Sequence, residues 1–349
     1  MKLCIGKLFP KRNKIKAYHL LTSRIFRRLD GPSIADQSGT LQNMRPPDIT
    51  PLYRRDSFNM QFITFKNLTD KGGDMCCHGI PYAEFDRTGH WGIWNFMRIF
   101  EASRHAITMK NDIFRLTFES KDYTLMTRRQ KFKFGQRFHG NISLFSRFLP
   151  KVTYELVEIG NSTFTIHQQL FDNLSESSEI FAECLTRVVH VNLKAKQHEA
   201  LNPGVINRYS DLYRKTSAIW HVKNIFPDDV KKMPSYTMSV RVPYSDIDFK
   251  QHMSHASYCK YYTDCATNAI DAGVYRHFEQ DICWYPILEV DIEYRDGLAA
   301  GEMFEVQTWQ DDENLQHLFF ETRSKGDVIN RASFVMGLEK SKKNRHSKI

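Results

Sequence analysis

The sequence has no apolar run that could cross a bilayer, and its seven cysteines include no C-x-x-C pair. A membrane-spanning helix needs about 20 consecutive apolar residues, so no transmembrane segment is expected. An odd number of cysteines without paired spacing favours a reducing compartment over a disulfide framework. With 41% hydrophobic residues among 349, the chain has enough apolar side chains for about two globular domains.

Acidic residues are missing from residues 1–29, which hold nine Lys or Arg, and from residues 340–349, which hold five. These basic residues outnumber the net charge of +9, so the body of the chain is mildly acidic. We therefore expect no nucleic-acid partner for the body. The basic first segment fits a mitochondrial transit peptide, a tether to an anionic membrane or a solvated tail, which leaves mitochondrial and cytoplasmic locations open.

A twelve-residue pattern occurs twice, 162 residues apart. IPYAEFDRTGHW occupies residues 80–91, and VPYSDIDFKQHM occupies residues 242–253. Both copies read apolar-Pro-Tyr-x-acid-x-Asp-x-x-x-His-apolar, so each carries a carboxylate and an imidazole four positions apart. Such an internal repeat predicts a duplicated structural unit with a duplicated candidate active site.

The same order of predicted elements follows each copy. Helical spacing covers residues 91–107 and 256–272, and Gly273 is at the position of a C-terminal capping glycine. Short β-prone stretches separated by turns predict an antiparallel sheet after each helix. The expected strands are residues 132–134, 152–159, 163–171 and 180–191 in the first unit, and 237–244, 287–294, 303–310, 315–323 and 328–339 in the second.

These elements predict two domains and three accessory segments. They are a basic leader and linker at 1–53, a first domain at 54–196, a connection at 197–233 with a helix around 206–218, a second domain at 234–339, and a basic tail at 340–349.

The second copy resembles two branches of the hotdog thioesterases. Residues 246–253 resemble the Asp-Leu-Asp-x-Asn-Gln-His-Val pattern of the acyl-ACP thioesterases. Residues 255–262 resemble the His-Ala-x-Tyr-x-x-(Phe/Tyr)-Tyr pattern of the 4-hydroxybenzoyl-CoA thioesterase-like branch. The resemblance implies an α+β fold of two tandem hotdog domains, each a curved antiparallel sheet wrapped around one long helix. It also implies a pseudo-dimer within one chain, and it leaves further homo-oligomers open.

By this resemblance, Asp248 is the catalytic carboxylate, which acts as nucleophile or as general base for water. His252 and His255 match the histidines of the two branches and are suited to orienting water or moving a proton. Asp86 and His90 are the corresponding catalytic candidates of the first copy.

Four further residues are expected to bind substrate: Lys250, Met253, Tyr258 and Trp91. Tyr258 also fits a role in the hydrophobic core. Glu101 and Asp264, at nearly matched helix positions, are candidates for a second catalytic carboxylate. The acyl chain is expected in an apolar tunnel along the helix.

Structural roles compete with these assignments. Asp86 and Asp248 are residue types that often cap helices. Glu84 and Asp246 are expected to form structural pairs, and Tyr82 and Tyr244 are expected to pack against the body.

The predicted reaction is hydrolysis of a fatty acyl thioester, linked to CoA or ACP, to free acid and thiol, with no cofactor. The oxygen and nitrogen donors around Asp248 lack a spacing such as H-E-x-x-H, so no metal is expected. A non-catalytic acyl-binding or scaffolding protein remains an alternative, because Lys250 and Ser254-His255 replace asparagines of the acyl-ACP pattern. A hotdog dehydratase or hydratase fits less well, because its Asp and His lie five positions apart.

Overall fold

The computed structural model describes most of the chain from Ile63 to Glu339. The described ranges are 63–110, 123–175, 178–192, 194–195, 197–217, 219–220, 225–226, 234–248 and 251–339. The predicted basic leader and tail lie outside these ranges, as does Lys250.

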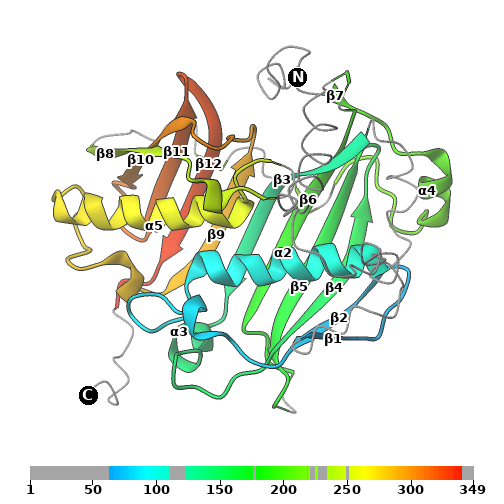
Figure 1. Ribbon diagram of the computed structural model, residues 1–349, viewed down its shortest axis with the longest axis horizontal. Coiled ribbons are helices and arrows are strands. Elements are labelled where there is room, and N and C mark those ends of the chain that lie inside the picture. The colour runs from blue at the N-terminus through cyan, green and yellow to red at the C-terminus, as the bar shows by residue number, and fades with distance from the viewer. Residues whose placement is uncertain are drawn as a thin grey trace, which may run out of the picture. The chain divides into compact units, whose positions relative to one another are not determined.

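One antiparallel sheet runs through the described residues (Figure 1). Its strands are β1 (Ile63–Lys66), β2 (Gly72–Cys77), β3 (Tyr123–Phe134), β4 (Pro150–Ile159), β5 (Thr163–Asp172), β6 (Ala182–Asn192), β7 (Gln197–His198), β8 (Ser235–Arg241), β9 (Ile287–Tyr294), β10 (Met303–Gln310), β11 (His317–Ser324) and β12 (Asp327–Met336). The strand order is β1-β2-β4-β5-β6-β3-β9-β12-β11-β10-β8, and β7 pairs with β6. The prediction of an antiparallel sheet with few helices is confirmed.

The strand order has an internal symmetry. Inside the additional edge strand β1, the first half reads β2-β4-β5-β6-β3, and the second half, from its edge inward, reads β8-β10-β11-β12-β9. The halves meet where β3 pairs with β9, with Phe132 opposite Val290. Two half-buried ion pairs reinforce this junction. Arg129 binds both carboxylate oxygens of Asp291 at 2.8 Å, and Arg128 reaches Glu293 at 2.9 Å.

Two long helices lie on one face of the sheet, α2 (Ile93–Lys110) and α5 (His255–Asp271), and they contact each other (Figure 1). Their first residues are 162 positions apart, the same spacing as the sequence repeat. As predicted, Gly273 ends α5: its φ is 69°, its N–H donates to Ile270 O, and the next N–H donates to Ala269 O. Only glycine adopts this left-handed conformation without a steric penalty.

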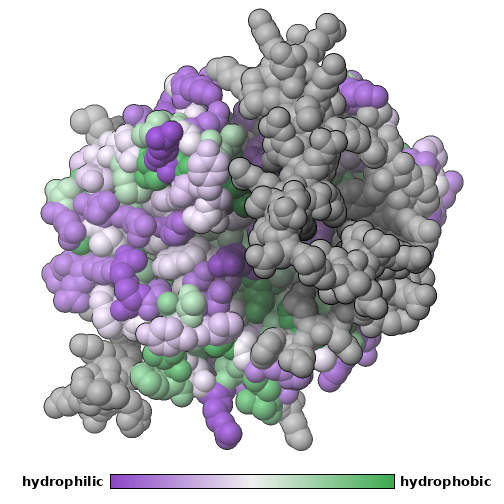
Figure 2. All heavy atoms as spheres, viewed as in Figure 1, coloured by the Kyte–Doolittle hydropathy of each residue, from purple (hydrophilic) through white to green (hydrophobic). Residues whose placement is uncertain are grey.

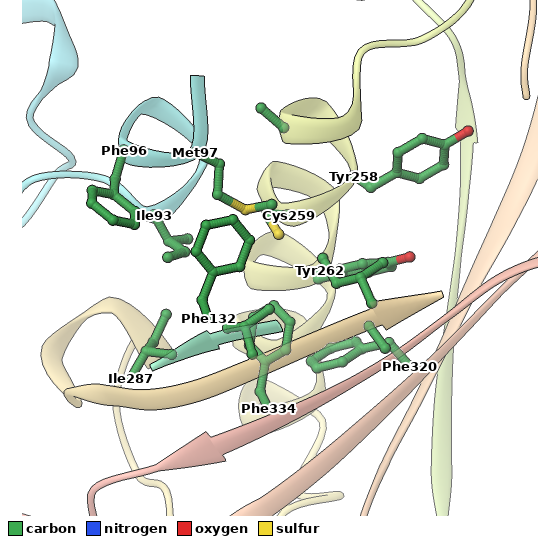
Figure 3. Close-up of a cluster of buried hydrophobic side chains, with 14 of the residues drawn as sticks. Ile93, Phe96, Met97, Phe132, Tyr258, Cys259, Tyr262, Ile287, Phe320 and Phe334 are labelled. Atoms are coloured by element: carbon green, nitrogen blue, oxygen red, sulfur yellow. The ribbon is translucent and has the colours of Figure 1, made fainter. Parts of the chain in front are cut away.

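The apolar faces of both helices form a common core above the sheet. Matched positions carry matched side chains, because Phe96 and Phe100 of α2 correspond to Tyr258 and Tyr262 of α5, and all four are at most 2% exposed. Figure 3 shows these helices over the strands, with residues from both halves in one cluster. The space expected for an acyl tunnel along the helices is therefore occupied by aromatic rings.

The predicted helix at 206–218 is largely wrong. The observed helix, α4, is Pro203–Arg208, with Asn202 accepting a hydrogen bond from Gly204 N–H at its start. After it, the buried Tyr209 donates its hydroxyl to Asp70 O. The chain then forms a parallel bridge to Ile159 at the end of β4, and this pairing replaces further helix.

Two strand predictions also differ from the structure. β3 starts nine residues before the predicted 132, because its charged outward side chains pair with β9 and hide the apolar alternation. β8 ends at Arg241 instead of reaching 244, because Pro243 cannot donate to a strand and a 3-10 turn begins at Tyr244.

Tyr82 and Tyr244 do not pack against the body, contrary to prediction, since they are 79% and 84% exposed. Each begins a 3-10 turn (Tyr82–Glu84 and Tyr244–Asp246) that directs the ring outward. On the face seen in Figure 2, hydrophilic and hydrophobic residues are intermixed. Among the described helices, none has the length and apolar character to span a membrane.

The ion pairs at the β3–β9 junction predict a large effect of Arg129→Met. The substitution leaves the Asp291 carboxylate, 16% exposed, without its counter-charge, so the free energy of unfolding should fall by about 2–4 kcal/mol. Urea denaturation followed by circular dichroism measures this change. Arg137→Met is the matched control, because Arg137 is 65% exposed and its pair with Glu179 should contribute less than about 1 kcal/mol. Equal losses in both variants would contradict a junction that depends on Arg129.

Candidate functional site

The two copies of the repeat form loops with the same backbone hydrogen bonds. Asp86 N–H donates to His90 O, and Asp248 N–H donates to His252 O, both at 2.8 Å. Gly92 N–H donates to Glu84 O at 3.1 Å, and the matching Ser254 N–H donates to Asp246 O at 2.9 Å. We name the segments 81–92 and 243–254 the first loop and the second loop.

The residue before each histidine has a left-handed conformation. Gly89 has a φ of 80°, and Gln251 has a φ of 65°. Glycine adopts this conformation freely, but it is uncommon for glutamine. The second loop therefore keeps the conformation of the first although the glycine is replaced.

Each loop is tied to its own helix by an acid–base pair. Glu84 lies 3.9 Å from Arg98, and the Asp246 carboxylate binds Lys260 at 2.6 Å and the hydroxyl of Tyr261. In both copies the basic residue follows the acidic one by fourteen positions. The predicted structural pairing of Glu84 and Asp246 agrees with these contacts.

In the first loop, the Asp86 carboxylate is engaged by the loop itself. Its Oδ1 accepts hydrogen bonds from Thr88 N, Thr88 Oγ1 and His90 N at 2.8, 2.6 and 3.2 Å. The Thr88 hydroxyl also lies 2.8 Å from His90 Nδ1, so it connects the carboxylate to the imidazole. Asp86 thus holds the loop and does not cap α2. Burial lowers the pKa of His90, although the charge of Asp86 opposes this shift.

The first loop borders a small cavity that belongs mainly to the other half. Its walls include Thr263 and Ala266 of α5 and an apolar set from β11 and β12, namely Leu318, Phe320, Phe334 and Met336. Its free volume of about 20 Å³ accommodates roughly one water molecule. A bound alkyl chain would require these side chains to move.

An ion pair fastens the first loop to the second half. Arg87 Nη2 donates to Asp281 Oδ1 at 2.8 Å, and Arg87 Nη1 lies 3.6 Å from Asp264. Asp264, a predicted candidate for a second carboxylate, therefore lies at the edge of the first loop. Burial raises the pKa of Asp264 despite this neighbouring guanidinium.

In the second loop, His252 is packed against the segment after β9. A Cβ at Gly297 would lie 2.9 Å from His252 Cδ2, so only glycine leaves room for the imidazole. Met253 N–H donates to Leu298 O at 2.8 Å. His252 N lies 3.4 Å from Asp248 Oδ1, so Asp248 faces its own loop as Asp86 does.

His255 opens α5 and meets the other half. Its Nδ1 lies 3.5 Å from Glu101 Oε1 of α2, and its ring lies edge-on to Tyr294 at 4.6 Å. Ser254, the residue that precedes α5, makes no side-chain cap, and within the described residues its carbonyl oxygen accepts only from Ser257 N–H, at 3.1 Å. The predicted residues Asp248, His252 and His255 thus share the second loop and the start of α5, and Glu101 joins His255 across the junction.

The predicted substrate-binding residues are mostly core residues. Trp91, Met253 and Tyr258 are 3%, 3% and 2% exposed, and all belong to the hydrophobic cluster beneath the helices. Trp91 also lines the cavity beside the first loop. Within the described ranges, no three His, Cys, Asp or Glu side chains are placed to hold a metal ion.

Sequence reasoning missed two residues beside the first loop, one from each half. His139 of the short helix α3 (Gln136–Asn141) lies 6.4 Å from the His90 ring, and Cys283 lines the same cavity. Neither residue belongs to a repeated pattern, so the sequence carries no signal for them. Burial raises the pKa of Cys283, which keeps this side chain a neutral thiol near pH 7.

Because the pKa of His139 is lowered in the folded chain, we expect the free energy of unfolding to depend on pH. Burial lowers its pKa to about 4, while Ile287 N–H donates to its Nε2 at 2.9 Å. Between about pH 6.5 and 4 the unfolded chain binds a proton that the folded chain does not, so stability falls as the pH falls. The loss should reach up to about 3 kcal/mol. Urea titrations at pH 7.5 and 4.5 should show a smaller difference for His139→Gln, whose amide can accept the same hydrogen bond without titrating. An unchanged difference would assign the effect to other groups.

Comparison with known proteins gives matches at the level of structure alone. Neither protein-family models nor curated proteins match this sequence. The 12:0-ACP thioesterase from Umbellularia californica is similar with a TM-score of 0.58 at 12% identity, over 77% of this chain and 97% of that one. An acyl-ACP thioesterase from Bacteroides thetaiotaomicron is similar with a TM-score of 0.55 at 14% identity, over 76% and 98%. The described part of the chain therefore has the fold of the hotdog acyl-ACP thioesterases.

Proposed function

We propose that this chain hydrolyses acyl thioesters carried by CoA or ACP, and that the second loop is its active site. We further propose that it consists of two fused hotdog domains, 54–196 and 234–339, which act as a pseudo-dimer. The strand order that repeats in both halves, the matched helices and the matched loops support the fusion.

One observation carries the choice of site: His255 and Glu101 meet across the junction of the halves, at the start of α5. At the matched positions beside the first loop, the residues are Ile93 and Thr263, which cannot form an acid–base pair. Beside the first loop the further imidazole is His139, at 6.4 Å from the His90 ring, and the carboxylates Asp264 and Asp281 pair with Arg87. At the second loop the carboxylate of Glu101 instead faces the imidazole of His255. Such a group of titratable side chains is what proton transfer requires.

The proposed reaction assigns one task to each group. Asp248 activates a water that attacks the carbonyl carbon of the thioester, or it attacks this carbon directly. In the direct route, water then hydrolyses the resulting acyl anhydride, which releases the acid and restores the Asp248 carboxylate. The N–H groups of His255 and Ala256, at the start of α5, stabilise the negative charge on the carbonyl oxygen. The C–S bond then breaks, and His252 or His255 passes a proton to the departing thiolate. Glu101 orients His255 and stabilises its protonated form, so it is a positioning residue.

The first loop is proposed as a structural counterpart. Its carboxylate already accepts three hydrogen bonds, and the cavity beside it has room for about one water. Arg87 also fastens this loop to Asp281 of the other half. These contacts suit a loop that stabilises the junction.

The carrier and the acyl group are part of the proposal. The names of the two similar structures indicate ACP-linked acyl groups for those proteins, so both acyl-ACP and acyl-CoA should be assayed here. A fatty acyl chain would have to displace core aromatic rings, which makes chain length an experimental variable.

Asp248→Asn should lower kcat for thiol release from acyl-CoA or acyl-ACP by about 10²–10⁴-fold, because it removes the base or nucleophile. Asp86→Asn is the matched control in the first loop and should change kcat much less. Thiol release is followed with a chromogenic thiol reagent over acyl groups of several lengths. Activity that survives in Asp248→Asn and disappears in Asp86→Asn would move the site to the first loop. Binding without thiol release in the wild type would favour the non-catalytic acyl-binding protein.

The pair of Glu101 and His255 predicts non-additive kinetics. If Glu101 acts through His255, then Glu101→Gln and His255→Asn should each lower kcat, and the double variant should be no worse than His255→Asn alone. Asp264→Asn, at the nearly matched position of α5, serves as control. Additive losses in kcat would show that the two residues act independently.

A further inference from the structure

A buried polar group interrupts the core of the first half. Arg104 of α2 is 9% exposed, and Gln168 of β5 is fully buried beneath it. Ser103 and Thr186 are also fully buried in this half. The buried hydrophobic side chains of this half belong to two separate clusters. A core does not need such a group for packing, since burying polar atoms costs free energy unless they are well bonded.

The charge of Arg104 is poorly compensated. Within the described residues its hydrogen-bond partner is Gln168 Oε1, at the long distance of 3.4 Å, and it takes part in no ion pair there. Gln168 Nε2 is already bonded to Phe100 O and Ser103 Oγ at 2.8 and 2.7 Å, which fixes the amide and points its oxygen to the guanidinium. A guanidinium has five N–H donors and remains charged, so an anion would stabilise a buried one.

The repeat locates Arg104 relative to the proposed active site. With the 162-residue spacing, Glu101 and Arg104 match Thr263 and Ala266, and both of the latter line the cavity beside the first loop. Glu101 accordingly reaches His255 beside the second loop. Arg104 is three residues further along α2, about 4.5 Å deeper into the first half.

The residues behind the two loops thus differ in polarity and charge. Behind the first loop the walls are Leu318, Phe320, Phe334 and Met336, which suit an alkyl chain or a packed core. By the same repeat, Arg104 and the amide of Gln168 hold the position behind the second loop that Ala266 and its neighbours hold behind the first, so an acyl group that extended past His255 would be directed toward them.

We propose that the acyl group accepted at the second loop carries a carboxylate, which Arg104 binds with a charge-assisted hydrogen bond while Gln168 holds the guanidinium in place. This inference rests on the proposed function, and it replaces a plain alkyl chain with a short dicarboxylic acyl group as the preferred substrate. A hydrogen bond to a charged group contributes enough to change the specificity constant by about 10- to 100-fold.

The test compares two acyl groups of equal length. Glutaryl-CoA and valeryl-CoA differ in a terminal carboxylate or methyl group, and thiol release gives kcat/KM for each after subtraction of spontaneous hydrolysis. The wild type should prefer glutaryl-CoA by at least about 10-fold. Arg104→Met should remove or reverse this preference. Arg98→Met is the control, because Arg98 lies on the same helix, is 63% exposed and should leave the preference intact.

A binding measurement separates this inference from the proposed function. The thioethers S-(4-carboxybutyl)-CoA and S-pentyl-CoA cannot be hydrolysed, and calorimetry gives their Kd for the full chain. Tighter binding of the carboxylate by about 10-fold, without hydrolysis of either thioester, would keep this inference and reject the hydrolase. Efficient hydrolysis of valeryl-CoA at the rate of glutaryl-CoA would overturn this inference and keep the hydrolase. If the wild type neither binds nor hydrolyses these compounds, both this inference and the proposed hydrolase activity are rejected. Because the wild-type ratio is decisive by itself, the test does not depend on Arg104→Met folding.

Discussion

The pairing of β3 with β9 is the constraint on which the rest of the structure depends. It joins two antiparallel halves into one sheet, and it brings α2 and α5 into contact above that sheet. Every contact described between a loop and the opposite half follows from this arrangement, including His255 with Glu101 and Arg87 with Asp281. The candidate site is therefore a property of the junction and not of either half alone.

The two halves share a backbone plan but differ at the contacts between each loop and the opposite half. Matched core positions keep aromatic rings, and matched loops keep their hydrogen bonds. In contrast, the contact between the halves beside the first loop has Ile93 and Thr263. The matched contact beside the second loop has His255 and Glu101. In a homodimer of identical units both contacts would change together. A single chain that contains both units can keep one contact for stability and adapt the other.

The sequence was sufficient to predict the two long helices, most strands and the paired loops, because these depend on local spacing and on a repeat. β3 was mostly missed, since its charged residues, such as Arg129, are satisfied by a strand that follows more than 150 positions later. His139 and Arg104 were missed for the same reason. Their surroundings come from distant segments, and no local pattern distinguishes them from ordinary surface residues. Tyr82 and Tyr244 were predicted to pack against the body, but both are exposed. An aromatic residue in a tight turn need not be buried.

The long separation between β3 and β9 has a consequence for biosynthesis. β3 leaves the ribosome well before its partner, so an early-folding first half would present an unpaired strand edge that could aggregate. Arg128, Arg129 and Lys131 lie along the part of β3 that faces β9. Charged side chains on an open edge disfavour association with other strands. The same positive residues that later bind Asp291 and Glu293 would thus protect the nascent chain until its second half is made.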